Sequence, residues 1–150
     1  MKKTILLISI AILWLAVNIS AQVTEADKAA IKQTALNYAE GWYEGNADKM
    51  ESALHPNLAK RRAATNDKGQ SRLDELSAMG LVQGTRSGFG KQTPKEEQQK
   101  DVTILDITGN AATVKLEMRD WVDYMHIAKF NGKWVIVNVL WELKPKKVDK

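Results

Sequence analysis

Hydrophobic positions between residues 24 and 45 follow the period of an α-helix. Apolar side chains recur at spacings of four, three and four residues, at Ile31, Ala35, Tyr38 and Trp42. Thr24 followed by Asp27 resembles a capping box, and Gly45 can end the helix. The pattern predicts one long amphipathic helix that carries aromatic rings near its C-terminal end.

A second, shorter helix is predicted directly after the first. Asn46 can cap its start, and His55-Pro56 ends it, because proline disfavours helical backbone in the residue before it. Residues 58–64 are then expected to be extended. The N-terminal part of the chain therefore begins with a helical hairpin.

A third helix is predicted from a second capping box, formed by Ser71 and Asp74. Leu73 and Leu76 would give this helix a narrow buried stripe. The following residues 80–99 contain four glycines and a proline without any hydrophobic period. They are predicted to form a long loop, and loops of that length are usually functional or mobile.

From residue 101 onward the hydrophobic period becomes two, which is typical of strands. Gly109-Asn110 and Asn131-Gly132 are two-residue hairpin signals. They predict four antiparallel strands, at residues 101–108, 111–119, 121–130 and 133–143.

Pairing of Phe130 with Lys133 at the second turn assigns the last two strands to two faces. One face carries Trp121, Asp123, Met125, Ile127, Trp134, Ile136, Asn138 and Leu140. The other carries Val122, Tyr124, His126, Ala128, Val135, Val137, Val139 and Trp141. Both faces are apolar and need a cover, and the helices of so short a chain supply only one.

The first residues are typical of a cleavable signal peptide. Lys2 and Lys3 precede an apolar run over residues 5–17, which is shorter than the ~20 residues that span a bilayer. Ser20-Ala21 offers a cleavage site before Gln22. The sequence predicts a signal peptide over residues 1–21, a single α+β domain over residues 22–150, export to the periplasm or the medium, and no stable membrane anchor after cleavage.

Composition narrows the possible chemistry. The chain contains no cysteine, which excludes disulfides and thiolate catalysis. Loss of Lys2 and Lys3 lowers the Lys and Arg count from 22 to 20 against 18 Asp and Glu, so nucleic-acid binding is not expected. Lys60-Arg61-Arg62 is interpreted as a solvated strand edge. Two histidines without cysteines do not predict a metal site, and no cofactor is predicted.

Several runs of residues, together with the order of predicted elements, resemble a known superfamily. The runs are Tyr38–Gly45, Leu54-His55-Pro56, Val122-Asp123-Tyr124 and Gly132–Asn138. They resemble the nuclear transport factor 2-like (SnoaL-like) superfamily, and within it the bacterial branch labelled "putative lumazine-binding". The resemblance implies a cystatin-like, cone-shaped α+β fold, in which N-terminal helices pack on a curved antiparallel sheet around a conical pocket. That superfamily includes isomerases, cyclases, dehydratases and binding proteins, so the fold alone leaves the function open.

The expected pocket faces the long helix and the sheet face that carries Trp134. Asp123 is the one carboxyl group expected to point inward, and it would be the general acid or base if the protein were an enzyme. A structural polar pair between Asp123 and Asn138 is the alternative, as are a helix-capping role for His55 and core roles for the aromatic residues. The predicted ligand-binding residues are Tyr38, Trp42, His55, Trp121, Asp123, Trp134 and Asn138.

The first functional hypothesis is an exported, non-enzymatic protein that binds a small planar or hydrophobic molecule, such as a pterin or lumazine. The second is an isomerase or cyclase that uses Asp123, and the third is a protein-interaction module. The second apolar sheet face is expected to form a homodimer, and the alternative is that the loop over residues 80–99 folds back over this face and leaves a monomer. Its predicted interface residues are Tyr124, His126, Val137, Val139 and Trp141.

Overall fold

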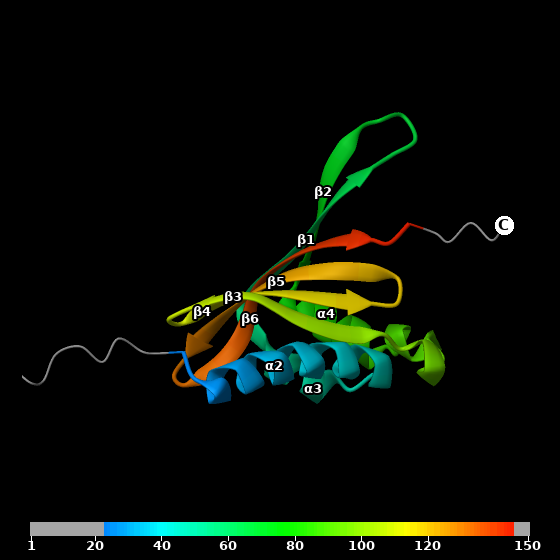
Figure 1. Ribbon diagram of the computed structural model, residues 1–150. Coiled ribbons are helices and arrows are strands. Elements are labelled where there is room, and N and C mark those ends of the chain that lie inside the picture. Colours follow the sequence, from blue (N-terminus) through cyan, green and yellow to red (C-terminus); the bar gives the residue numbers. More distant parts are fainter. Residues whose placement is uncertain (1–22, 146–150) are drawn as a thin grey trace, which may run out of the picture.

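Thr24 starts the first helix of the computed structural model, which describes residues 23–145 (Figure 1). Helix α2 (Glu25–Glu44) has both halves of the predicted capping box, and it ends at Gly45, which adopts a left-handed φ of 66°. Helix α3 (Ala47–Ala53) is capped by the Asn46 side chain. The helical hairpin is therefore confirmed. The predicted signal peptide lies outside the described residues.

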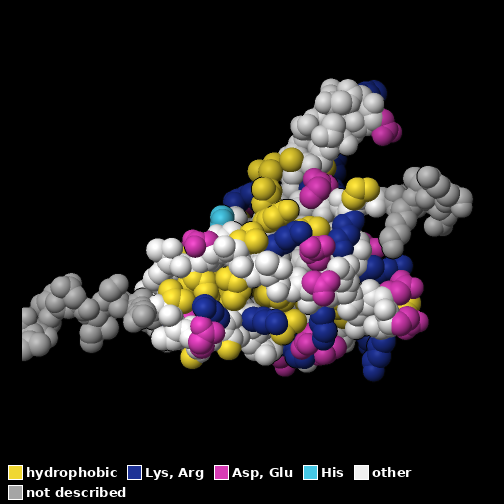
Figure 2. All heavy atoms as spheres, viewed as in Figure 1, with side chains coloured by type: hydrophobic (Ala, Val, Ile, Leu, Met, Phe, Trp, Pro, Cys, Tyr) yellow, Lys and Arg dark blue, Asp and Glu magenta, His cyan; other side chains and the backbone are white. Residues whose placement is uncertain are grey.

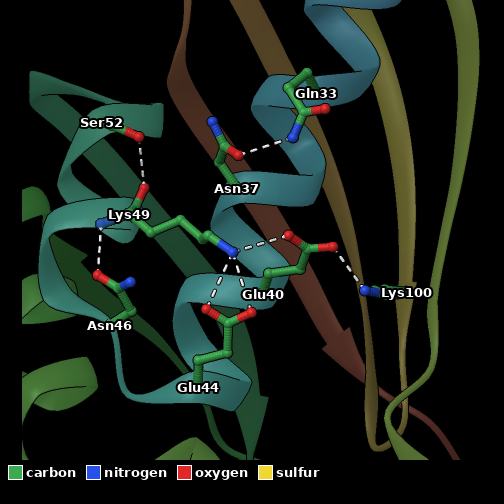
Figure 3. Close-up of polar contacts among 8 residues, drawn as sticks. All are labelled: Gln33, Asn37, Glu40, Glu44, Asn46, Lys49, Ser52 and Lys100. Carbon is green, nitrogen blue, oxygen red and sulfur yellow. Dashed lines mark hydrogen bonds and ion pairs between the residues drawn. The ribbon is translucent and has the colours of Figure 1, made fainter.

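An ion-pair network fixes the two helices to each other and to the sheet (Figure 3). Lys49 Nζ of α3 lies 3.0 Å from carboxylate oxygens of both Glu40 and Glu44 of α2. Lys100, at the start of strand β3 (Lys100–Thr108), binds the other oxygen of Glu40 at 2.6 Å. Hydrogen bonds from Lys100 and Lys49 lower the pKa of Glu40. The network therefore links α2 to α3 and to the start of β3.

Six strands form one curved sheet, and the helices lie against one of its faces (Figure 1). The remaining strands are β1 (Leu54–Thr65), β2 (Ser71–Ser77), β4 (Ala111–Met118), β5 (Trp121–Phe130) and β6 (Lys133–Leu143). Their order is β2-β1-β6-β5-β4-β3. β1 and β6 pair in parallel, and the other neighbouring strands in this order pair antiparallel. The four predicted C-terminal strands and the α+β class with a helix layer on a curved sheet are confirmed. No helix within residues 23–145 has the length and apolar character to cross a membrane.

The predicted third helix is wrong, because residues 71–77 form strand β2 instead. They pair with β1, which brings Glu75 beside Arg61, at 2.7 Å between Oε2 and Nε. Ser71 does not cap a helix, since its hydroxyl bonds that of Thr65 across the strands at 2.9 Å. Leu73, expected to be buried, is 62% exposed. The β1–β2 hairpin extends well beyond the rest of the sheet (Figure 1).

The predicted loop over residues 80–99 is also largely wrong. Its first part belongs to helix α4 (Ala78–Arg86), which Ser77 caps by accepting a hydrogen bond from the Gly80 amide at 3.2 Å. Two short 3-10 helices follow, η1 (Phe89–Gln92) and η2 (Lys95–Glu97). Leu81 and Val82 of α4 are buried in the core. Because glycine has a low helix propensity, the sequence pattern did not indicate α4, which tertiary packing stabilises.

A β-bulge at Val137 changes the predicted faces of β6. The register of β5 and β6 is regular from the turn to Ile127, which pairs with Ile136, and then His126 pairs with Asn138. Val137 is thus an extra residue on β6. Because side chains alternate along a strand, one inserted residue exchanges the two faces beyond it.

The exchange corrects four predicted positions, one of which is Leu140, expected on the inner face but 53% exposed on the outer face. Asn138 points to the outer face, where its amide lies 3.3 Å from His126 Nδ1. Val139 is fully buried, so it cannot belong to an outer interface. Trp141 pairs with Asp123 and packs against the core. The inner face of the sheet is therefore more aromatic than the strict alternation predicted.

Candidate functional site

A pocket opens between helix α2, helix α4 and the sheet, at the point where the β1–β2 hairpin leaves the molecule. Its volume is about 220 Å³. The residues around it come from seven elements and are almost all apolar or aromatic. They are Tyr38, Trp42, Lys60, Leu76, Gly80, Leu81, Gly84, Phe89, Trp121 and Trp141.

A buried ion pair forms the base of the pocket. The Asp123 side chain has no exposed surface, and the Lys60 ammonium donates a hydrogen bond to Asp123 Oδ1. Trp121 Nε1 donates to Oδ2 of the same carboxylate at 2.9 Å. Lys60 also donates to the Tyr38 hydroxyl at 2.7 Å. Each carboxylate oxygen therefore has a donor, which compensates for burial of its charge.

Burial and charge affect the two other titratable groups of this network. Removal from water lowers the pKa of Lys60, and the negative charge of Asp123 opposes that change. Burial and the Asp123 charge raise the pKa of Tyr38 well above its usual value. Tyr38 thus remains a neutral phenol over a wide range of pH.

Aromatic rings surround the Lys60 ammonium and form the pocket walls. The Nζ atom lies 4.9 Å from the ring centre of Trp141, 5.3 Å from that of Tyr38 and 5.7 Å from that of Trp121. Trp121 packs edge-to-face against Trp141 and also against Trp42, with centroid distances of 6.3 and 5.9 Å. The base of the pocket is therefore a lysine enclosed by aromatic faces.

The mouth of the pocket is open to solvent. Phe89 of η1 is 66% exposed, and Leu76 of β2 is 44% exposed. Gly84 of α4 lies beside the Phe89 ring, which would be 3.5 Å from a Cβ built at that position.

The structure brings four of the predicted ligand-binding residues together and separates three others from them. Tyr38, Trp42 and Trp121 line the pocket, and Asp123 lies at its base. Three other predicted residues lie elsewhere, namely His55, Trp134 and Asn138.

Each of the three has a structural role in place of a pocket position. Trp134 is buried near the start of α2, where its Nε1 donates to Asp27 at 3.0 Å. His55 stacks on Phe130 with a centroid distance of 4.7 Å, and its Nδ1 accepts from the Asn57 amide. Asn138 lies on the outer face, so the predicted Asp123–Asn138 pair does not exist. Lys60 is the polar partner of Asp123.

Sequence reasoning missed Lys60 and Trp141 as pocket residues. Lys60 was interpreted as part of a solvated edge, but it is only 4% exposed. A usable signal existed, because Leu58 is apolar and residues two apart on a strand face the same side. Leu58 is indeed buried, and Lys60 follows it inward. Within residues 23–145, no three His, Asp or Glu side chains are placed to hold a metal ion.

Comparison with known proteins identifies one matching family. The family described as "Putative lumazine-binding" matches residues 26–142, which include the whole pocket. No curated protein matches the chain. Many solved structures do.

Three of the solved structures are representative. An NTF2-like protein of unknown function from Shewanella baltica is 20% identical, with a TM-score of 0.63, over 83% of this chain and 100% of its own. Another NTF2-like protein of unknown function, from Methylobacillus flagellatus, is 21% identical, with a TM-score of 0.62, over 85% of this chain and 100% of its own. A ketosteroid isomerase-like protein from Erwinia carotovora atroseptica is 10% identical, with a TM-score of 0.55, over 81% of this chain and 100% of its own. These structures share the fold of this chain.

Proposed function

Since the chain belongs to the NTF2-like family described as "Putative lumazine-binding", we propose that it is an exported protein that binds a small planar molecule above Lys60. The observation that carries the proposal is the aromatic pocket with a buried ion pair at its base. Its volume of about 220 Å³ is below the ~300–1,000 Å³ of typical ligand pockets. A ligand of one or two fused rings suits this size better than a dinucleotide does.

Lys60 gives the pocket a polar contact for such a ring. An ammonium group has three N–H donors, and those of Lys60 bind Asp123 and Tyr38, with no third partner within residues 23–145. The remaining N–H can bind a carbonyl oxygen or a ring nitrogen of the ligand. The indole faces of Trp121 and Trp141 favour a flat ring beside it. Pterins and lumazines combine these two properties.

The alternative, an isomerase or cyclase that uses Asp123 as general acid or base, has less support. Both oxygens of Asp123 already accept hydrogen bonds, from Lys60 and Trp121. A general base must be within hydrogen-bond reach of the proton that it removes. The closed surroundings of Asp123 therefore favour a structural and electrostatic role in ligand binding.

Ligand entry is expected to change tryptophan fluorescence. Titration with lumazine, pterin or 2-naphthol should alter the emission of Trp42, Trp121 and Trp141, because a stacked ring changes the surroundings of an excited indole. Trp121→Phe should reduce the change, whereas Trp134→Phe should leave it intact, because Trp134 lies outside the pocket. If none of the three compounds changes the emission or releases heat in calorimetry, the proposal is wrong.

We also propose a homodimer through the outer face of the sheet, which the helices do not cover. Tyr124 and Leu140 are register partners on this face and are 45% and 53% exposed. His126 and Val137 lie beside them on the same two strands. Exposed apolar groups of this kind often mark interfaces, and a two-fold contact needs only one such surface.

Sedimentation tests the dimer. The wild-type protein should sediment as a dimer at micromolar concentration, and Leu140→Glu should sediment as a monomer because it places charge in the interface. Leu105→Glu is the matched control, since Leu105 is equally exposed, at 52%, but lies on the edge strand β3. A wild-type protein that is monomeric would defeat this proposal.

A further inference from the structure

The inner face of the β1–β2 hairpin continues outward from the pocket. Lys60 lies at the base of the pocket, and Arg62 and Ala64 follow on the same side of β1, because residues two apart share a face. Their partners on β2 are Leu76, Asp74 and Arg72 in that order. The apolar pocket therefore leads onto a strip of hairpin that carries two arginines.

A polar groove follows this strip. Its volume is about 450 Å³, and its lining includes Arg62, Asn66, Gln70, Ser71 and Arg72. In Figure 2 the visible surface of the outer hairpin consists mostly of backbone and of side chains that are neither hydrophobic nor charged. Asp74 is ion-paired with both arginines, at 3.0 Å from Arg62 Nη2 and 2.7 Å from Arg72 Nε. Two guanidinium groups with one carboxylate leave a net positive charge in the groove.

Arg62 joins the groove to the pocket. Its guanidinium carbon lies 4.7 Å from the ring centre of Trp141, which lines the pocket. Its Nε atom is buried and has no hydrogen-bond partner among the described residues. A buried N–H without an acceptor is costly, so an acceptor oxygen at this point would stabilise it. Arg62 Nε therefore lies between the pocket and the groove, on the side toward which a substituent of a ring bound in the pocket would extend.

We propose that the groove is a second subsite, and that the ligand carries a carboxylate or phosphate on a short chain attached to its ring. This inference rests on the proposed function. The rings would stack in the pocket while the anionic group binds Arg62 and Arg72, because guanidinium groups bind such oxygens with two parallel hydrogen bonds. Two residues of strand cover ~7 Å, which corresponds to a chain of about four atoms.

A matched pair of ligands isolates the subsite. The two probes are 4-(2-naphthyl)butanoate and its neutral amide, which differ in charge and hardly in shape. The acid should bind the wild-type protein about tenfold more tightly than the amide, as expected for a charge-assisted hydrogen bond. Added salt should weaken binding of the acid and leave the amide unchanged. Inorganic phosphate should compete with the acid but not with 2-naphthol, which has no chain.

Variants on the two faces of the hairpin provide the controls. Arg62→Gln and Arg72→Gln should each remove most of the advantage of the acid over the amide, and Arg72→Gln should also leave 2-naphthol affinity unchanged. The Arg72 variant is the cleaner test, because Arg72 does not contact Trp141 and its replacement should not disturb the pocket. Arg61→Gln should have no effect, because Arg61 lies on the opposite face beside Glu75.

The outcomes separate the two proposals. If the amide and 2-naphthol bind but the acid binds no better, the groove is not a subsite and the pocket proposal stands. An acid advantage that persists in both Arg62→Gln and Arg72→Gln also overturns the subsite. If neither neutral compound binds, the pocket proposal itself fails.

Discussion

Replacing Asp123 by asparagine is expected to lower the free energy of unfolding by about 3 kcal/mol at neutral pH. The change leaves the Lys60 ammonium buried without a negative partner, and removal of one member of a buried pair typically costs ~3–5 kcal/mol. Lys60 can release its proton and become neutral, which avoids an unpaired buried charge. The expected loss is therefore at the lower end of that range. Urea denaturation followed by circular dichroism measures it.

The loss should depend on pH in a defined direction. Burial already lowers the pKa of Lys60, and Asp123→Asn removes the charge that opposes this effect. Between the lowered pKa and the ordinary value of 10.5, the unfolded chain binds a proton that the folded variant lacks. The stability of the variant should therefore rise with pH over this interval. The raised pKa of Tyr38 has the opposite effect above its ordinary value of 10.0, so the measurement stops below that pH.

A double variant distinguishes a structural cost from a functional one. Lys60→Met with Asp123→Leu removes both charges and should regain most of the stability, because an apolar pair of similar size often replaces a buried ion pair at little cost. It should still lose affinity for lumazine, since the donor for the ring is absent. A double variant as unstable as Asp123→Asn would contradict the ion-pair explanation.

Gly90→Ala is expected to destabilise the protein by about 3 kcal/mol or to displace the η1 helix. A Cβ atom at this position would lie 2.1 Å from the carbonyl oxygen of Trp42 and 2.5 Å from its Cδ1. The oxygen belongs to the backbone of α2, so it cannot move without bending the helix, and overpacking of this kind typically costs ~1–3 kcal/mol. Displacement of η1 would also move Phe89 and Trp42, and hence weaken binding in the pocket.

Gly84→Ala is the matched control for this prediction. Its Cβ would lie 3.5 Å from the Phe89 ring, which is an ordinary contact distance, and the position is inside helix α4. Alanine is favoured over glycine in a helix interior by ~1 kcal/mol, so this variant should be as stable as the wild type or more stable. Equal stability of Gly90→Ala and Gly84→Ala in urea would show that η1 does not pack closely on α2.

Two identical local signals show how far the sequence predicts the fold. Thr24 with Asp27 and Ser71 with Asp74 have the same capping pattern, yet the first starts a helix and the second lies in a strand. A cap contributes only about 1 kcal/mol. Each of residues 71–77 pairs with a residue of β1, and this pairing depends on residues 59–65, which lie outside the local capping pattern.

The pocket residues also fall into two groups, those whose positions the sequence predicts and those whose positions it does not. Tyr38, Trp42, Trp121 and Asp123 lie on elements whose periods are regular, so their inward positions follow from spacing. Trp141 and Asn138 lie beyond the bulge at Val137, which exchanges their faces, and strict alternation cannot reveal one inserted residue. Lys60 was missed for a different reason, since its neighbours Arg61 and Arg62 gave it the appearance of a surface charge.

The parallel contact between β1 and β6 determines when this protein can complete its fold. Lys60 pairs in register with Val139, and its ionic partner Asp123 is 63 residues away along the chain. β1 therefore leaves the ribosome long before the strand that it must join. Pairings between distant segments form slowly, because loop-closure entropy opposes them. Such a delay suits the proposed export, in which the chain crosses a membrane before its last strands can close the sheet.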